Sequence, residues 1–235
     1  MKSICYHPAL GEITVSQSYR SRRVAISVRP SGEVRLSIPM HVSVREGIAV
    51  LDKQKKWVEE ARGKMAERRV TELIEMPYAT RNFTLRLNPA NTLRRNSHLA
   101  GNEIIVSYPA QEHYTNPKVQ AAIRRGLEKA WRVEAKEILP KRLEELARQR
   151  GLNFRSVSIR RSVTRWGSCS TSNDISLSLF LMRLPDRLID YILLHELCHT
   201  IHKNHSKRFY DLLDRLCDGR NAELRRELKE YRILT

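Results

Sequence analysis

Hydrophobic and polar residues alternate along several short segments in the first part of the chain. The alternation is clearest at 12–16, 24–28 and 33–38, and Arg29-Pro-Ser-Gly32 joins the last two segments. A side-chain period of two is typical of a half-buried strand, and a Pro/Gly turn between two strands favours a hairpin. The same pattern predicts further strands at 83–87, before a turn at 88–91, and at 103–107, 157–160 and 174–179.

Helical signals separate these strands. Ser43 followed by Glu46 has the spacing of a capping box, which predicts a helix that runs towards Arg69. A long helix is predicted at 117–150, and Pro140 should kink or split it. Three more helices are predicted from Pro185 or Asp186 to Lys203 and Asn204, from Lys207 to Leu216, and from Asn221 to about Tyr231.

Together these elements predict an α+β fold. A chain of 235 residues is long enough to bury a core, in one domain or in one domain with a small lobe. The predicted division is a β-rich N-terminal lobe with helices at 1–112 and a mainly helical lobe at 113–235. The sequence shows no internal repeat and no long linker.

The most informative motif is His195-Glu-Leu-Cys-His199, which lies in the helix predicted after Pro185. Histidines four residues apart project from one helix face, about 6 Å apart along the axis, so both can bind one metal ion. Glu196 is rotated by about 100° from His195, which leaves it beside the ion, where a general base for water belongs. The uncharged residues around the motif indicate a buried helix. The motif therefore predicts a catalytic zinc site.

A catalytic zinc usually has three protein ligands, so one more is needed. His205 is preferred, because the chain can leave the helix just before it and return this side chain to the ion. His202 shares the helix face but lies about 10 Å further along, which predicts a supporting role or none. Cys198 points away from that face. A glutamate of the C-terminal helix, such as Glu223 or Glu227, is the alternative.

The composition is strongly basic, with 43 lysines and arginines against 26 acidic residues and a formal net charge of +17. Such a surface attracts polyanions, so weak nucleic-acid binding without sequence preference is expected. The four cysteines are scattered and form no C-x-x-C pair, which favours reduced thiols. The N-terminus lacks the apolar run of a signal peptide, and no segment suits a membrane span. A cytoplasmic protein without membrane contact is expected.

Three blocks of sequence carry a resemblance to a known family. They lie at 22–39, at Arg165-Trp-Gly-Ser-Cys-Ser170 with 175–177, and at 189–209. These blocks resemble the YgjP-like metallopeptidase-domain family, which is related to the WLM and SprT/Spartan zinc proteins. The resemblance extends over about 20–216, as one continuous family domain.

The resemblance has implications for the site and the fold. It implies a zinc ion bound by His195, His199 and His205, with Glu196 as the catalytic acid and base. It also implies that the C-terminal lobe is a minimal zincin-like core, in which a sheet packs on the metal-binding helix.

Substrate contacts are predicted around the second block and after the third histidine. Val163 and Tyr210 depart from the family pattern, which more often has a basic residue and a tryptophan there. Tyr191 is a further candidate for stabilising an oxyanion. The strand that begins near Ile175 could accept an extended peptide by strand addition. The predicted substrate-binding residues are Arg165, Trp166, Ser168, Ile175 and Tyr210.

Three functions fit these features. The preferred one is a zinc-dependent hydrolase that acts on polypeptides. The second is hydrolysis of nucleoside triphosphates to pyrophosphate, an activity associated with YgjP-like proteins, although the sequence has no Gly-rich phosphate loop. The third is a nucleic-acid-associated protein, either a SprT-like protease that acts on DNA-bound proteins or a binding module with a structural zinc.

Overall fold

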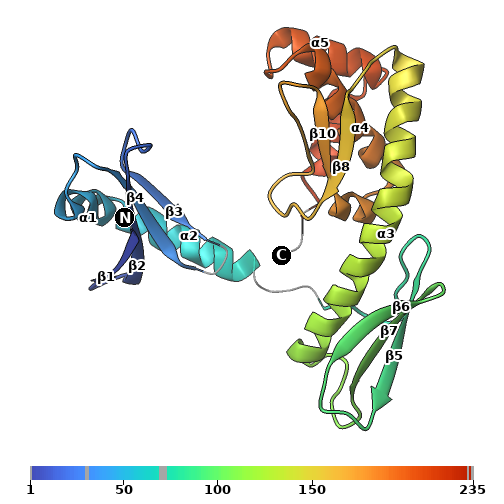
Figure 1. Cartoon of the computed structure of the whole chain (residues 1–235), viewed down its shortest axis with the longest axis horizontal. Helices are drawn as coiled ribbons and strands as arrows, with labels where there is room; N and C mark the ends of the chain where they lie inside the picture. Colours follow the sequence, from blue (N-terminus) through green and yellow to red (C-terminus); the bar gives the residue numbers. More distant parts are fainter. Residues whose placement is uncertain (1, 30–31, 69–72, 232, 234–235) are drawn as a thin grey trace. The chain divides into compact units, whose positions relative to one another are not determined.

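The computed structural model describes residues 2–29, 32–68, 73–231 and 233 (Figure 1). Contacts group the chain into two compact units, Met1–Glu72 and Leu73–Thr235. Each unit combines helices with at least one mixed sheet, which confirms the predicted α+β class. The predicted separate domains 1–112 and 113–235 stay a prediction.

The first unit contains a four-stranded sheet with the strand order β1-β2-β4-β3. The predicted hairpin is confirmed, because β3 and β4 pair antiparallel, although Pro30 and Ser31 of its turn lie outside the described residues. Strand β1 was not predicted. Its side chains Ile4 and Tyr6 are 71% and 76% exposed, so its apolar residues do not mark a buried face. The strands are β1 Lys2–His7, β2 Gly11–Ser18, β3 Ala25–Val28 and β4 Val34–Pro39.

The helix predicted after Ser43 consists of two helices, α1 (Val44–Lys53) and α2 (Lys55–Arg68). The capping box is confirmed, since Ser43 accepts a bond from the Glu46 amide and Glu46 accepts one from the Ser43 amide. A single continuous helix was wrong, because α1 ends at Gln54, whose amide bonds back to the carbonyls of its last turn. The predicted end at Arg69 lies outside the described residues.

The second unit is organised around α3 (Pro117–Arg150), which spans the predicted range. Asn116 caps its start, and Gly151 ends it in the left-handed conformation at φ 64°, which glycine adopts without steric strain. Pro140 lies inside the helix and does not split it, while the predicted kink stays a prediction. The helix contacts β6 and β7 and also β8 and α4, so it holds both sheets of this unit (Figure 1).

One sheet of the second unit packs on the start of α3. It has the order β5-β7-β6, with β5 parallel and β6 antiparallel to β7. The turn predicted at 88–91 was wrong, because β5 continues to Ala90. Strand β6 was not predicted, since its one fully buried residue is the polar Ser97. The strands are β5 Thr84–Ala90, β6 Asn96–Ala100 and β7 Glu103–Pro109.

The other sheet has the order β8-β10-β9. Strand β10 lies at its centre, parallel to β8 and antiparallel to β9. Peptide addition to β10 was therefore a wrong expectation, because both of its edges are already paired. The strands are β8 Ser156–Arg160, β9 Gly167–Cys169 and β10 Asp174–Ser178, and a short 3-10 helix, η1, follows at Leu179–Arg183.

The last three helices begin where the sequence predicts. They are α4 Asp186–Ile201, α5 Lys207–Leu216 and α6 Asn221–Leu228. Helix α4 ends two residues before the predicted exit, and Ser206 caps α5 as predicted. Among the described residues, no helix has the length and hydrophobicity needed to span a membrane.

The contact between α3 and the β5–β7 sheet gives a test of the fold. A Cβ atom at Gly126 would lie 2.6 Å from Ile104 Cγ2 and 3.2 Å from Ser97 Cβ. We expect Gly126→Ala to lower the free energy of unfolding by about 1–3 kcal/mol, because helix and sheet must separate. Urea unfolding followed by circular dichroism measures this change.

The matched control is Gly63→Ala, also in a helix, where no described atom outside the local helix backbone lies within 4 Å of the new Cβ. It should leave stability unchanged or raise it by up to about 1 kcal/mol, because alanine favours helix. Equal effects of the two substitutions would contradict the close packing at Gly126.

Candidate metal site

Helix α4 carries the first two histidines of the candidate site and is itself firmly buried. Leu193 and Leu197 are fully buried, and the helix contacts β9, α3, α5 and α6. This packing fixes the direction in which His195 and His199 project. The next helix, α5, starts only after residue 206, so the short connection between the two helices carries His205.

The three histidines converge. Their candidate ligand atoms all lie within 4.8 Å of one another. The Nε2 atoms of His195 and His205 are 3.1 Å apart, and the ring centroids of His199 and His205 are 4.7 Å apart. Two ring nitrogens this close repel each other unless one carries a hydrogen or a cation lies between them.

Two neighbours orient the rings. The His199 Nδ1–H donates to the His202 carbonyl oxygen over 3.0 Å, which leaves Nε2 of His199 with a free lone pair. Metal-binding histidines commonly use their second nitrogen in this way. Phe209, fully buried on α5, lies 4.6 to 5.0 Å from all three rings, measured between centroids. It closes the apolar side of the cluster.

The surroundings favour the neutral form of the two imidazoles on α4. Burial, followed by the nearby His199 and His205, lowers the pKa of His195 to about 3. Burial also lowers the pKa of His199. A neutral imidazole is the form that binds a metal ion.

Glu196 lies next in sequence to His195 but in different surroundings. Its side chain is 5% exposed, and its Oε2 atom has no hydrogen-bond partner among the described residues. Burial raises the pKa of Glu196 to about 8, and the charge of Arg165 acts in the opposite direction. A buried carboxylate oxygen without a partner is costly, so its presence on the residue that follows His195 indicates a functional position.

Gly167 of β9 is the closest contact of Glu196 from the sheet. A Cβ atom at this position would lie 2.5 Å from Glu196 Oε1 and 2.8 Å from Cδ. The backbone of β9 therefore rests directly against the carboxylate, and any side chain there would displace it. Gly167 thus sets the position of Glu196 relative to the histidines.

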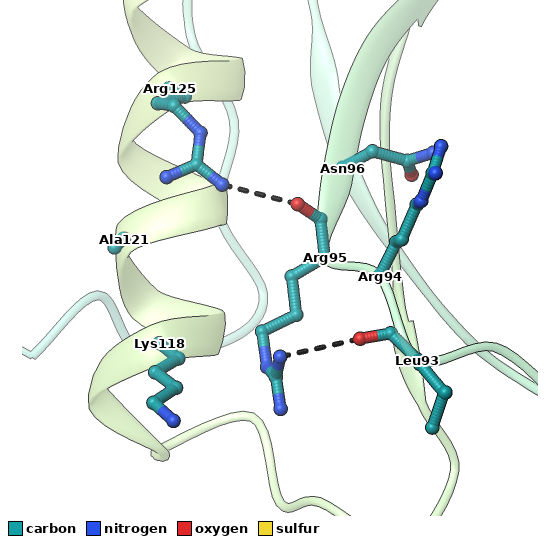
Figure 2. Close-up of a pocket in the computed structure, with 7 residues that line it drawn as sticks. All are labelled: Leu93, Arg94, Arg95, Asn96, Lys118, Ala121 and Arg125. Carbon is teal, nitrogen blue, oxygen red and sulfur yellow. Dashed lines mark hydrogen bonds between the residues drawn. The ribbon is translucent and has the colours of Figure 1, made fainter.

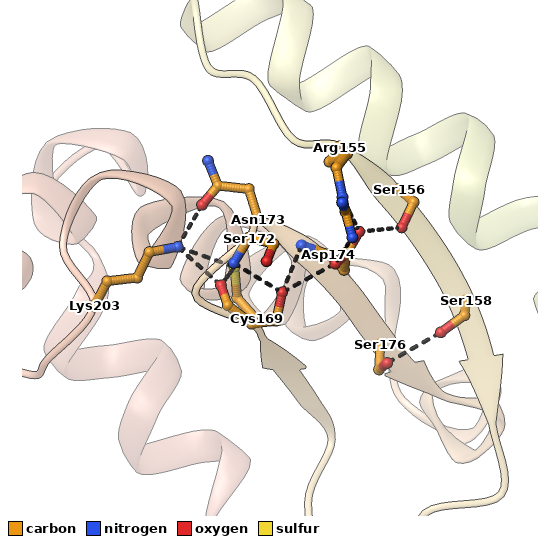
Figure 3. A network of polar contacts seen from close by, with 10 residues as sticks. Arg155, Ser156, Ser158, Cys169, Ser172, Asn173, Asp174, Ser176 and Lys203 are labelled. Carbon is orange, nitrogen blue, oxygen red and sulfur yellow. Dashed lines mark hydrogen bonds and ion pairs between the residues drawn. The ribbon is translucent and has the colours of Figure 1, made fainter.

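A polar network ties the connection between α4 and α5 to the turn between β9 and β10 (Figure 3). Lys203 donates to the Ser170 carbonyl oxygen over 2.9 Å and also to Asn173 Oδ1. Asn173 has a φ of 63° and closes this turn. Lys203 is two residues from His205, so these bonds hold the third histidine's segment against the sheet.

The same network extends across the sheet to β8. Asp174 accepts bonds from Arg155 and Ser156, and these bonds lower the pKa of Asp174 to about 2. Ser158 and Ser176 are linked by their hydroxyl groups over 3.0 Å. The charged and hydroxyl groups in Figure 3 thus join β8, β10 and the turn after β9.

The predicted substrate-binding residues occupy different surroundings. Arg165 is exposed, and its charge acts on Glu196. Trp166 packs partly against the core. Ser168 follows Gly167, so its side chain points to the opposite face of β9 from Glu196. Tyr210 stacks on His205 with centroids 6.0 Å apart. Ile175 is only 1% exposed, so its predicted contact with a substrate gains no support.

Two further candidates from the sequence are engaged elsewhere. Tyr191, 4% exposed, donates to Asn221 Oδ1 over 3.1 Å, so its hydroxyl is not free for an oxyanion. The alternative ligands Glu223 and Glu227 pair with Arg220 and Arg187. The geometry therefore favours His205 as the third ligand.

The residues present fit a small divalent cation. At a zinc–nitrogen distance of about 2.0–2.1 Å, tetrahedral ligand nitrogens lie about 3.3 Å apart. The 3.1 Å between His195 and His205 is close to this value. Imidazole donors suit zinc, copper, iron and nickel. The three histidines could therefore hold a metal ion. Glu196, whose Oε2 is unpaired among the described residues, directly follows the first of them in sequence.

Sequence reasoning missed three residues that shape this site. No role in the site was predicted from the sequence for Gly167 or Phe209, and Lys203 was predicted only as part of a helix end. The signal for Phe209 was present, since it follows His205 by one helical turn. The contacts of Gly167 and Lys203 join distant segments, and no local pattern indicates them.

Comparisons with known proteins identify the family of the chain. A family model described as YgjP-like, metallopeptidase domain, matches residues 22–231. Among solved structures, the chain is similar to the metallopeptidase zymogen abylysin of Pyrococcus abyssi, with 24% identity and a TM-score of 0.36 over 42% of this chain and 100% of that chain.

The chain is also similar to the zymogen jannalysin of Methanocaldococcus jannaschii, with 22% identity and a TM-score of 0.32 over 38% of this chain and 96% of that chain. A comparison with curated proteins finds no match. The family model extends over both units and includes the three histidines and Glu196. This chain belongs to the YgjP-like metallopeptidase-domain family.

Proposed function

We propose that the protein is a zinc-dependent peptidase in which His195, His199 and His205 bind the metal and Glu196 transfers protons. The observation that carries the proposal is the convergence of three ring nitrogens within 4.8 Å. It is joined by a buried carboxylate with an unpaired oxygen on Glu196, the residue that follows His195. Structural zinc sites in proteins are usually closed by a fourth protein ligand. Among the described residues, no fourth candidate joins this cluster, which supports a catalytic site.

Zinc at this site would supply a Lewis acid that polarises a carbonyl group and activates water. The protein's own part in the chemistry belongs to Glu196. Its carboxylate accepts a proton from the attacking water and passes it to the departing amine. Gly167 keeps the carboxylate in place during both transfers.

Strand β9 is the proposed binding site of the peptide substrate. Trp166 O and Ser170 N bond to β10, so the backbone groups of Gly167 and Cys169 between them point to the other edge of β9. No strand pairs with that edge in the described part of the chain. An extended peptide can add there by backbone hydrogen bonds, next to Glu196. Arg165 and Tyr210 flank the site and are the proposed side-chain contacts.

Two alternatives from the sequence remain open to test. The first alternative is a nucleotide substrate, whose phosphates would neutralise the positive charge of Arg165 near Glu196. The second alternative is a purely structural metal ion, which would leave Glu196 without a role in proton transfer. Proteolysis of DNA-bound proteins is a narrower form of the proposed activity. A cytoplasmic location is the setting that the scattered cysteines favour.

The third ligand is tested by His205→Ala. Removing one of three ligands should weaken metal binding by more than about 100-fold. This exceeds the loss of metal affinity expected for a residue that only forms a hydrogen bond to a ligand, which is about 10- to 100-fold. Elemental analysis and chelator competition on the purified protein measure this. The matched control is His202→Ala, which keeps the carbonyl that orients His199. Metal retained equally by both variants would contradict the assignment of His205.

The proton-transfer role is tested by Glu196→Gln, which preserves size and removes the basic oxygen. Hydrolysis of an unfolded protein should fall by about 10²–10⁴-fold, while metal content stays the same. The control is Glu144→Gln on the exposed face of α3. Undiminished hydrolysis would contradict the proposal. Assays with nucleoside triphosphates, each with and without chelator, identify the alternative if only that activity depends on Glu196.

The close approach of β9 is tested by Gly167→Ala. The new methyl group must push Glu196 aside, and a displacement of about 1 Å can slow a reaction by about 100-fold. The rate constant with saturating substrate should fall while the histidines keep their metal. Ser168→Ala, on the opposite face of the same strand, should retain activity. A Gly167→Ala variant with full activity would refute this positioning role.

A further inference from the structure

A basic hollow lies on the second unit where the connection between β5 and β6 meets the first turns of α3 (Figure 2). Its volume is about 460 Å³. It is built from parts of the sequence other than the histidine cluster, and the proposed peptidase does not use it. The hollow is lined by Leu93, Arg94, Arg95, Asn96, Lys118, Ala121 and Arg125.

Internal bonds shape this hollow. Arg95 forms a two-point ion pair with Glu112, in which Nε lies 2.7 Å from Oε2. Arg125 donates to the Arg95 carbonyl oxygen over 3.2 Å, and Arg95 donates to the Leu93 carbonyl oxygen over 3.4 Å (Figure 2). These bonds fix the connection before β6 against the helix. The shape of the hollow therefore exists before any ligand binds.

Most of its positive charge is uncompensated. Glu112 neutralises Arg95, but in the part of the chain that the structure describes no carboxylate pairs with Arg94 or Arg125. Lys118 lies in the first turn of α3, which contains no acidic residue. A cation is unfavourable at the positive end of a helix, where an anion is favoured. The hollow thus offers a negatively charged ligand the three exposed cations Arg94, Lys118 and Arg125, together with the start of a long helix.

The spacing of the cations indicates an extended ligand. Lys118, Ala121 and Arg125 share one face of α3, and the ends of this row lie about 10 Å apart along the helix axis. Arg94 adds a further cation on the connection that forms the other wall. A single phosphate cannot reach across such a row, whereas consecutive phosphates of a polymer can. Ala121, between the two cations, leaves the row open to a backbone.

We propose that this hollow binds the phosphodiester backbone of nucleic acid without sequence preference. Cations at fixed spacing bind phosphates, and no side chain in the hollow has the planar aromatic surface for reading bases. A membrane surface fits less well. Leu93 is 92% exposed but is the one large apolar side chain in the lining, and stable anchoring to lipid needs far more apolar area.

The test is binding of a fluorescein-labelled 20-base-pair DNA duplex to the full chain at several salt concentrations. The variant Arg94→Gln/Arg125→Gln removes two exposed cations. Affinity at low salt should fall by at least about tenfold, and the slope of log K against log salt should decrease by about 1.8, because each phosphate contact contributes about 0.9. The matched control, Lys136→Gln/Arg148→Gln, removes the same charge from exposed sites further along α3 and should bind almost as the wild type.

A second variant, Ala121→Glu, removes no cation but places a negative charge between Lys118 and Arg125. It should also weaken binding, and circular dichroism confirms that each variant is folded. Equal losses in the hollow variant and the control would overturn the proposal, because they indicate a diffuse basic surface. Absence of DNA binding, or binding of phosphatidylserine vesicles alone, would overturn it as well.

Discussion

The arrangement of the site depends on one constraint, that three imidazoles share a volume only a few ångströms across. Such a cluster cannot persist on a flexible surface, because each ring gives up freedom of rotation and the two rings on α4 also give up hydration. The buried helix α4 supplies two rings at a fixed separation, and the reversal of the chain before α5 supplies the third. The His202 carbonyl and the ring of Phe209 then remove the remaining freedom.

Features encoded within a few residues of sequence were predictable. The capping box at Ser43, the start of α4 after Pro185 and the cap at Ser206 each depend on neighbours one turn away. The motif containing His195 and His199 is local in the same sense, because the helix alone brings its two rings together. The length of α3 followed from Asn116, Pro117 and Gly151 at its ends.

Features that depend on pairing between distant segments were not predictable. Apolar and polar residues alternate in β10, which was interpreted as the pattern of an edge strand, but β10 lies between two strands. Such alternation indicates that one face of the strand is buried, and it carries no information about the strands paired on either side. Gly167 matters because of a helix that begins 19 residues later, and the contact exists only in the folded chain. Arg94 and Lys118 likewise line one hollow only because β6 packs against α3.

The bonds of Lys203 to Ser170 and Asn173 have an energetic consequence that reaches beyond the loop itself. They join the segment that carries His205 to the hairpin formed by β9 and β10, in which β9 has the unpaired edge. An ordered hairpin therefore favours an ordered His205 segment, and the reverse also holds. Thermodynamic reciprocity then requires equal coupling in both directions. A polypeptide that rigidifies the hairpin would raise the affinity for the metal ion by a certain factor. The bound ion would raise the affinity for the polypeptide by the same factor.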